Sequence, residues 1–173
     1  EMNRKHDIEE YLGIIKTLKI AKPTIKFSSD FIIGYPNESE KDFIQTLSIL
    51  KKIKFINSYS FIFSPRPGTP AANMQLLDAD IAKKRLIKFQ LEAGEIKKNY
   101  REQLIGSFVN VLFENRTKND KIFFGRDEHN NSVIVKSDSN LIGKIVKVKI
   151  NRYNQNTLFG EILLNYNTKN FAA

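Results

Sequence analysis

The stretch that decides the fold of the first half of this chain lies between residues 30 and 43. It reads Asp30-Phe31-Ile32-Ile33-Gly34-Tyr35-Pro36-Asn37-Glu38-Ser39-Glu40-Lys41-Asp42-Phe43. The apolar run at 31–33 predicts the end of a short strand that is buried on both faces. Gly34 and Pro36 indicate a turn, and Ser39 with Asp42 is a pattern that opens a helix. The stretch therefore predicts a strand, a loop and a helix in succession.

Strands and helices alternate on both sides of this stretch. The expected elements are helices at 7–22, 39–53 and 78–104, and strands at 25–34 and 58–63. Strands joined through helices of this length are parallel. Because a two-stranded parallel sheet leaves its faces and edges uncovered, we expect this α/β half to belong to a larger barrel or open sheet.

The pattern changes at Gly106, where short strands replace the helices. Turns containing Asn, Asp and Gly separate five expected strands, at 108–114, 122–125, 132–136, 144–150 and 157–163. Five short antiparallel strands in this length are typical of a small, OB-like barrel. The residues after 164 are polar and are expected to form a frayed tail.

The composition excludes several classes of site. The 173 residues include 28 Lys and Arg against 19 Asp and Glu, a net charge of +9, and 41% are hydrophobic. There is no cysteine, so no disulfide, thiol nucleophile or cysteine-held iron–sulfur cluster can be built from this chain. Neither histidine, His6 or His129, lies in a pattern that predicts catalysis or metal binding. No apolar segment is long enough for a membrane helix, so we expect a cytoplasmic protein without membrane contact.

A run of basic residues in the second half is the first candidate binding surface. Residues 139–160 contain no acid, and their basic residues are Lys144, Lys147, Lys149 and Arg152. Strand alternation puts Lys147 and Lys149 on the outer face of the expected barrel. Beside exposed aromatics such as Phe123 or Tyr153, this row would suit contacts with RNA phosphates and bases. A solvated strand face, or a sheet edge protected by lysine, explains the same charges.

Two loops at the expected strand ends are the second candidate. In parallel α/β structures, ligands collect at the carboxyl ends of the strands. Gly34 allows a ligand to approach the backbone, and Ser39 turns the amides of its helix toward the first loop. The second loop, 63–70, holds three prolines that rigidify it around Arg66, which can grip a phosphate or a carboxylate. Ordinary turns explain each loop taken alone.

Taken together, these motifs resemble those of the tRNA methylthiotransferases of the radical S-adenosylmethionine superfamily, the MiaB type. The similar stretches are Met2-Asn3-Arg4, residues 30–43 as quoted above, and Tyr59-Ser60-Phe61-Ile62-Phe63-Ser64-Pro65-Arg66-Pro67-Gly68-Thr69-Pro70-Ala71-Ala72. Residues 106–163 are similar to the TRAM domain, the small RNA-binding barrel of these enzymes. The family usually has Gly-Phe-Pro-Gly-Glu-Thr where this chain has residues 34–39. The basic sequence around Arg66 resembles the tRNA-modifying branch more than the RimO type, which tends to have acidic residues there.

The resemblance implies an α/β fold, the carboxy-terminal part of a radical-SAM partial TIM barrel, at 1–105. A TRAM domain at 106–165 and a tail at 166–173 would follow. It also implies S-adenosyl-L-methionine and two 4Fe-4S clusters as cofactors, with the clusters held by cysteine motifs that this chain lacks. Enzymes of this family attach a methylthio group to C2 of an isopentenylated adenosine beside the tRNA anticodon. We therefore expect a carboxy-terminal fragment, inactive alone, of a monomeric enzyme that binds tRNA.

The resemblance also implies roles for individual residues. Those at the strand ends that would bind S-adenosylmethionine are Asp30, Ile32, Gly34, Phe63 and Ser64. Those that would orient the cofactor or bind tRNA are Glu38, Arg66, Lys144, Lys147, Lys149 and Arg152. No catalytic residue and no metal ligand is expected in this chain. The alternatives are a stand-alone RNA-binding module without catalysis and a ribosomal-protein methylthiotransferase of the RimO type.

Overall fold

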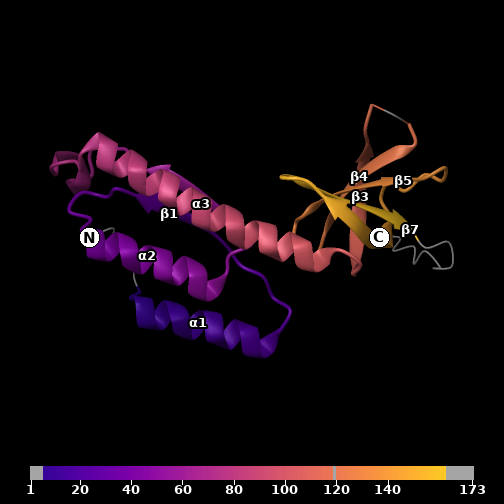
Figure 1. The fold of residues 1–173 in the computed structure, drawn as a ribbon, viewed down its shortest axis with the longest axis horizontal. Helices are drawn as coiled ribbons and strands as arrows, with labels where there is room; N and C mark the ends of the chain where they lie inside the picture. The colour runs from indigo at the N-terminus through magenta and orange to yellow at the C-terminus, as the bar shows by residue number, and fades with distance from the viewer. Residues whose placement is uncertain (1–5, 119, 163–173) are drawn as a thin grey trace. The chain divides into compact units, whose positions relative to one another are not determined.

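The chain folds into two compact units, one up to Lys97 and one from Lys98. The computed structural model describes residues 6–118 and 120–162. Met2-Asn3-Arg4, Leu163 and the expected tail lie outside the described residues. The first unit contains α1 (Ile8–Ala21), β1 (Ser28–Ile33), α2 (Glu40–Ile53), β2 (Asn57–Ile62), the 3-10 turn η1 (Pro70–Asn73) and most of α3 (Ala79–Leu104). Figure 1 labels α1, β1, α2 and α3.

Helices α1 and α2 begin within one residue of their expected starts, each at a capping box. Asp7 and Glu10 form a reciprocal capping box at the start of α1. At α2 the side chain of Ser39 accepts the amide of Asp42, and the Asp42 carboxylate accepts the amide of Ser39. Residues at helical spacing then form one buried face of α2, and these are Phe43, Leu47, Leu50 and Ile53.

The two strands of the first unit are parallel and in register from the Ser28–Asn57 pair to the Ile33–Ile62 pair. One face of this sheet is packed against helices. The ring of Phe31 lies 5.4 Å from that of Phe55 and 4.6 Å from that of Phe89. Ile33 is fully buried in the same cluster, to which α1, α2 and α3 all contribute.

The opposite face of the sheet is open. Ile32 is 43% exposed, Tyr59 57% and Phe61 59%. The prediction that residues 31–33 are buried on both faces was therefore wrong. Successive side chains of a strand point to opposite sides, and the helices of this unit cover only the side of Phe31 and Ile33.

The second unit contains the end of α3 and a closed five-stranded barrel, in which the strands follow the order β3-β4-β5-β7-β6. Its strands are β3 (Phe108–Arg116), β4 (Ile122–Asp127), β5 (Ser132–Lys136), β6 (Ile145–Tyr153) and β7 (Thr157–Ile162). The predicted OB-like barrel is confirmed, but the prediction of antiparallel strands throughout was wrong because β5 and β7 are parallel. An odd number of strands closed into a ring cannot alternate in direction at every pair.

The interior of the barrel follows the alternation of the strands. Residues from all five strands fill it, and those with no exposed surface include Val111, Phe113, Val133, Val148, Ile150 and Leu158. Gly125 lies where β4 approaches β3 closely, and a Cβ atom there would sit 2.4 Å from the carbonyl oxygen of Leu112. This closeness of two strands requires glycine.

The last turn of α3 is anchored in the second unit by two adjacent residues. Asn131 donates a hydrogen bond to the Tyr100 hydroxyl at 3.1 Å, and burial raises the pKa of Tyr100 to about 12. Arg101 donates from Nη1 to the carbonyl oxygen of Asn154 at 2.7 Å and to that of Gln155. These contacts make the helix end an integral part of the barrel. None of the helices within 6–118 and 120–162 has the length and apolar character of a membrane span.

Candidate functional site

The loops that follow β1 and β2 start at the same edge of the sheet. The amide of Phe63 donates to the carbonyl oxygen of Ile33 at 2.9 Å, one position beyond the last strand pair. The rings of Tyr35 and Phe63 meet edge to face, with centroids 5.1 Å apart. Parallel order therefore brings Gly34 and Ser64 to one edge, where α/β proteins bind ligands.

The first loop depends on the backbone of Gly34. Its φ is +73°, and an added Cβ would lie 3.0 Å from the Cβ of Ala82 on α3. Both the conformation and the space therefore favour glycine. Asn37, with φ of +66°, is the second residue of this loop in the left-handed region.

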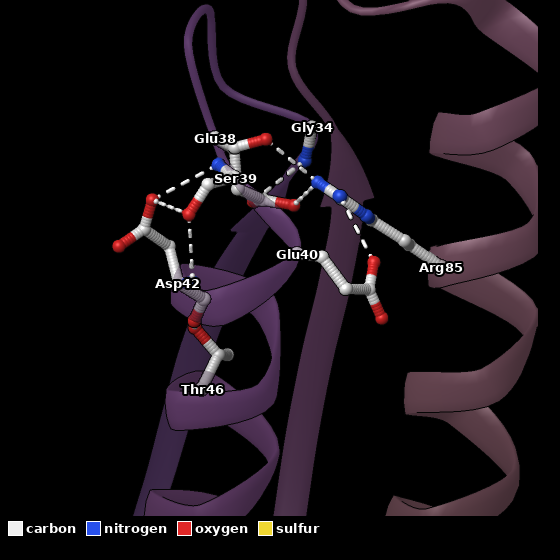
Figure 2. A network of polar contacts seen from close by, with 7 residues as sticks. All are labelled: Gly34, Glu38, Ser39, Glu40, Asp42, Thr46 and Arg85. Carbon is white, nitrogen blue, oxygen red and sulfur yellow. Dashed lines mark hydrogen bonds and ion pairs between the residues drawn. The ribbon is translucent and has the colours of Figure 1, made fainter.

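The carboxylate of Glu38 holds this loop in place (Figure 2). One oxygen accepts the amide of Gly34 at 2.9 Å, and the other accepts Nη1 of Arg85 at 2.7 Å. The side chain of Glu38 is only 10% exposed. Its two oxygens are thus engaged within the protein, so any effect of Glu38 on a ligand acts through the shape of the loop.

Arg85 on α3 is a further residue of this site, and no motif of the sequence predicts it. It is 7% exposed, and it also donates to the Glu38 carbonyl oxygen at 2.9 Å and to the Glu40 carboxylate at 3.0 Å. Its guanidinium carbon lies 5.4 Å from the centroid of the Phe43 ring. The available signal was a charged residue within the apolar stripe of the helix, three positions after Ala82 and four before Phe89.

The start of α2 completes this polar network (Figure 2). The Ser39 hydroxyl donates to the Asp42 carboxylate at 2.6 Å, and this hydrogen bond lowers the pKa of Asp42. The hydroxyl of Thr46 donates to the carbonyl oxygen of Asp42 at 3.1 Å. These contacts fix the direction in which the helix leaves the loop.

The five residues predicted to bind the cofactor occupy two adjoining places. Asp30 and Ile32 are exposed on the open face of the sheet, while Gly34, Phe63 and Ser64 lie at its edge. Phe63 is half-buried against Tyr35, and Ser64 is exposed. The arrangement offers a carboxylate and an apolar strand surface, while Gly34 is buried, with its amide bonded to Glu38 and Ala82 of α3 packed against its backbone.

Arg66 lies in the second loop and is exposed. The hydroxyl and the amide of Thr69 both donate to its carbonyl oxygen, at 2.8 and 3.2 Å. These two bonds, together with the flanking prolines, restrict the backbone and leave the guanidinium at the surface.

The predicted basic residues of the barrel lie in three different places. Lys147 and Lys149 point outward from β6 between buried residues, as predicted. Lys144 precedes this strand. Arg152 follows a bulge in β6, and its guanidinium carbon lies 3.7 Å from the centroid of the Phe159 ring.

The aromatic residues expected beside the basic row are less exposed than predicted. Phe123 is 1% exposed and packs edge to face on Phe113 in the barrel interior, so the prediction that it is exposed was wrong. The odd positions of β4 point inward, and the adjacent Phe124 takes the outer position. Tyr153 is half-buried, and its hydroxyl donates to the Glu102 carboxylate at 3.0 Å.

An iron–sulfur cluster or a metal ion has no fitting ligand set among the residues that the structure describes. The chain has no cysteine. Within 6–118 and 120–162, no three histidine, aspartate or glutamate side chains are grouped as metal ligands.

Comparison with known proteins adds to this geometry. The family model described as "TRAM domain" matches residues 102–163. The matched relatives include three proteins that bear the name tRNA-2-methylthio-N(6)-dimethylallyladenosine synthase. The one from Pelagibacter ubique is 52% identical over 93% of this chain, that from Wolbachia pipientis subsp. Culex pipiens 41% over 92%, and that from Acetivibrio thermocellus 40% over 94%.

The chain spans about a third of the length of these curated relatives, since the matches cover 36%, 37% and 34% of them. The similarity lies in their carboxy-terminal part and runs through both the α/β unit and the barrel. The chain is therefore homologous to the carboxy-terminal part of the MiaB-type tRNA methylthiotransferases and contains their TRAM domain.

Proposed function

We propose that this chain provides the cofactor-facing loops and the tRNA-binding barrel of a tRNA methylthiotransferase that makes 2-methylthio-N6-dimethylallyladenosine. The observation that carries this proposal is the 52% identity to a synthase of that name over 93% of the chain. It is supported by the two loops at one sheet edge and by the net charge of +9. The names of the relatives favour tRNA over a ribosomal protein as the substrate.

In this proposal the open sheet face and its edge receive S-adenosylmethionine, which supplies the adenosyl group that reacts. Asp30 accepts hydrogen bonds from ribose hydroxyls, and Ile32 and Phe63 contact the adenine ring. Gly34 and Ser64 border the ligand, and the bond from Glu38 to the Gly34 amide sets the loop. These residues bind and orient, so the chain by itself is not competent for the reaction.

The barrel supplies the contact with tRNA in the same proposal. Lys144, Lys147 and Lys149 contribute positive charge toward phosphates, and Arg66 contributes it from the second loop. The enzyme acts as a monomer in the cytoplasm, without membrane contact.

A chimera tests the proposal directly. The matching segment of the Pelagibacter ubique synthase is replaced by this chain, and the chimera is expressed in a bacterial host that lacks its own synthase. We expect 2-methylthio-N6-dimethylallyladenosine in digests of host tRNA. A soluble, cluster-loaded chimera that binds tRNA yet leaves dimethylallyladenosine unmodified would refute the proposal. A chimera that loads its clusters but does not bind tRNA would refute it as well.

Arg66→Ala in that chimera tests the second loop. Because Arg66 is exposed and its loop is held through backbone bonds, the variant is expected to fold as the parent does. We expect modification to fall about tenfold or more through the loss of a charge-assisted contact. Lys41→Ala, which removes an exposed charge from the start of α2, is the control. Parental levels of the modified nucleoside with Arg66→Ala would remove Arg66 from the site.

A further inference from the structure

Four outward-facing residues form a continuous row across the barrel. Phe124 of β4 lies opposite Ile134 of β5, and Ile134 lies opposite Phe159 of β7. Phe159 in turn lies opposite Arg152 of β6. The residues on either side of the first three along their strands are mostly buried in the interior, so the row faces outward. Phe124 and Phe159 are separated by two strand spacings, about 10 Å.

Each ring of this row has an arginine beside it. The guanidinium carbon of Arg152 lies 3.7 Å from the Phe159 centroid, and that of Arg126 lies 5.5 Å from the Phe124 centroid. Arg126 also faces the carboxylate of Glu114 at 3.5 Å and the side-chain oxygen of Asn130 at 3.2 Å. Arg126 is thus partly neutralised by Glu114, whereas Arg152 is exposed to solvent.

The turn next to Arg152 and Phe159 is held in place. Arg101 donates to the carbonyl oxygens of Asn154 and Gln155, and the Asn154 side chain accepts the amides of Asn156 at 2.9 Å and Thr157 at 2.7 Å. A fixed turn reduces the entropy that binding at this edge would cost.

From this arrangement we propose that the outer surface of β4, β5 and β7 is a stacking platform for unpaired nucleotides of RNA. The platform consists of Phe124, Ile134 and Phe159 with Arg126 and Arg152. Bases stack on the guanidinium planes that lie over its rings, and phosphates contact the arginines. This deepens the proposed function, on which it rests, by naming where the barrel holds RNA and in which form.

Charge and geometry favour unpaired RNA over other occupants. The segment 139–161, which supplies Arg152 and Phe159, carries four basic residues against the single acid Glu161, so it complements a polyanion. Stacking on side chains needs open base faces, which a duplex does not offer. Five-stranded OB barrels bind oligonucleotides on their second and third strands and on the loop between the fourth and fifth. In this barrel those are β4, β5 and the turn that Arg101 holds.

The test uses the full chain and two labelled RNAs, a 12-nucleotide uridine-rich single strand and a 12-base-pair duplex. Phe159→Leu keeps an apolar side chain but removes the aromatic face on which the Arg152 guanidinium lies. We expect it to weaken binding of the single strand about fivefold or more, and Phe124→Leu with Phe159→Leu to weaken it further. We expect the affinity for the duplex to stay within about twofold of the parent. The slope of log affinity against log salt should be unchanged for both complexes, because the substitutions remove no charge.

Phe108→Leu is the matched control. Phe108 is 45% exposed on β3, and the ammonium of Lys147 lies 5.5 Å from its centroid, so it is a ring beside a cation outside the platform. We expect no more than a twofold change for this variant. Thermal unfolding of each variant verifies that the barrel is folded.

Photocrosslinking of the parent chain to 5-iodouridine RNA keeps the proposal testable if a variant does not fold. Crosslinks on Phe124 or Phe159 support the platform. Unchanged single-strand affinity in the folded double variant, or crosslinks confined to β3 and β6, would overturn it. Binding of a protein partner at the platform by a chain that does not bind RNA would also overturn the proposal. The chimera would still form its modified nucleoside if only the platform were wrong, so the two failures are distinguishable.

Discussion

At the scale of single residues, the first loop depends on a buried arginine. Arg85 reaches from α3 to the carboxylates of Glu38 and Glu40, and Glu38 in turn binds the amide of Gly34. A buried cation with two acidic partners adds little net stability compared with an apolar side chain, but it fixes where its partners lie. The position of Gly34 at the sheet edge is therefore set by a residue that lies 47 positions from Glu38 in the sequence.

Arg85→Met tests this dependence. The substitution leaves the Glu38 carboxylate, which is only 10% exposed, without its cationic partner. We expect a loss of about 3 kcal/mol in the free energy of unfolding, measured with urea. Adding Glu38→Gln should recover a large part of that loss.

Lys88→Met is the control for Arg85→Met. Lys88 also lies near the Phe43 ring, at 5.9 Å, but it is exposed, so its loss should change stability by less than about 0.5 kcal/mol. Equal losses from Lys88→Met and Arg85→Met would contradict the role of the buried pair.

The raised pKa of Tyr100 predicts that the stability of the fold falls at alkaline pH. Burial raises its pKa from 10.0 to about 12, so the folded state keeps the phenolic proton that the unfolded state loses. The stabilisation is fully present below pH 10 and is lost as the pH rises toward 12. Between pH 9 and 12, the free energy of unfolding should decline less in Tyr100→Phe than in the parent chain. Tyr59→Phe, at an exposed tyrosine, should decline as the parent does.

At the scale of elements, the barrel is set by the register of its strands. Of two adjacent residues on β4, Phe123 lies in the interior and Phe124 on the outer surface. The closed order with β7 between β5 and β6 brings Phe124, Ile134 and Phe159 into one row. Any change in this closure would alter the interior and the candidate RNA surface together.

Gly125→Ala should weaken the barrel because its Cβ would meet the Leu112 carbonyl oxygen at 2.4 Å and Val111 Cγ1 at 2.7 Å. We expect a loss of about 2 kcal/mol or more in the free energy of unfolding. Gly94→Ala in α3 meets no atom within 4 Å and should raise stability by about 0.5–1 kcal/mol. Urea unfolding of both variants checks the contrast, and a tolerated Gly125→Ala would show that the strand approach is looser.

At the scale of the whole molecule, positive charge is present in both halves of the chain. Residues 1–105 carry 18 basic and 13 acidic groups, a net +5, and residues 106–173 carry 10 and 6, a net +4. The shorter half therefore has more positive charge per residue. Lys147 and Lys149 lie on its outer surface, although Lys149 is opposite Glu161. Salt-dependent attraction of a polyanion is the expected consequence.

Lys147→Ala with Lys149→Ala should weaken tRNA binding and reduce the slope of log affinity against log salt by up to about 1.4. Titrations of the full chain between 50 and 300 mM salt measure this slope. Lys83→Ala with Lys84→Ala removes the same charge from an exposed part of α3 and should change the slope by much less. Equal slopes for parent and barrel variant would argue against the basic strand.

Local sequence determined which segments form helices and strands. The helix-opening pattern of Ser39 with Asp42 is short-range, and the structure confirms it together with the helices expected at 7–22 and 39–53. The five barrel segments were likewise evident from their turns and their alternation. For the site, parallel order was sufficient to predict that the loops after the two strands begin at one edge.

Only the tertiary structure decided which face of each element is covered. It left Ile32 exposed, put Phe123 inside and Phe124 outside, and made β5 and β7 parallel. It also gave Glu38 its partner Arg85 from a distant helix. Local propensity depends on a residue and its near neighbours along the chain. Burial, closure and ion pairing depend on segments far apart in sequence, and only folding brings these together.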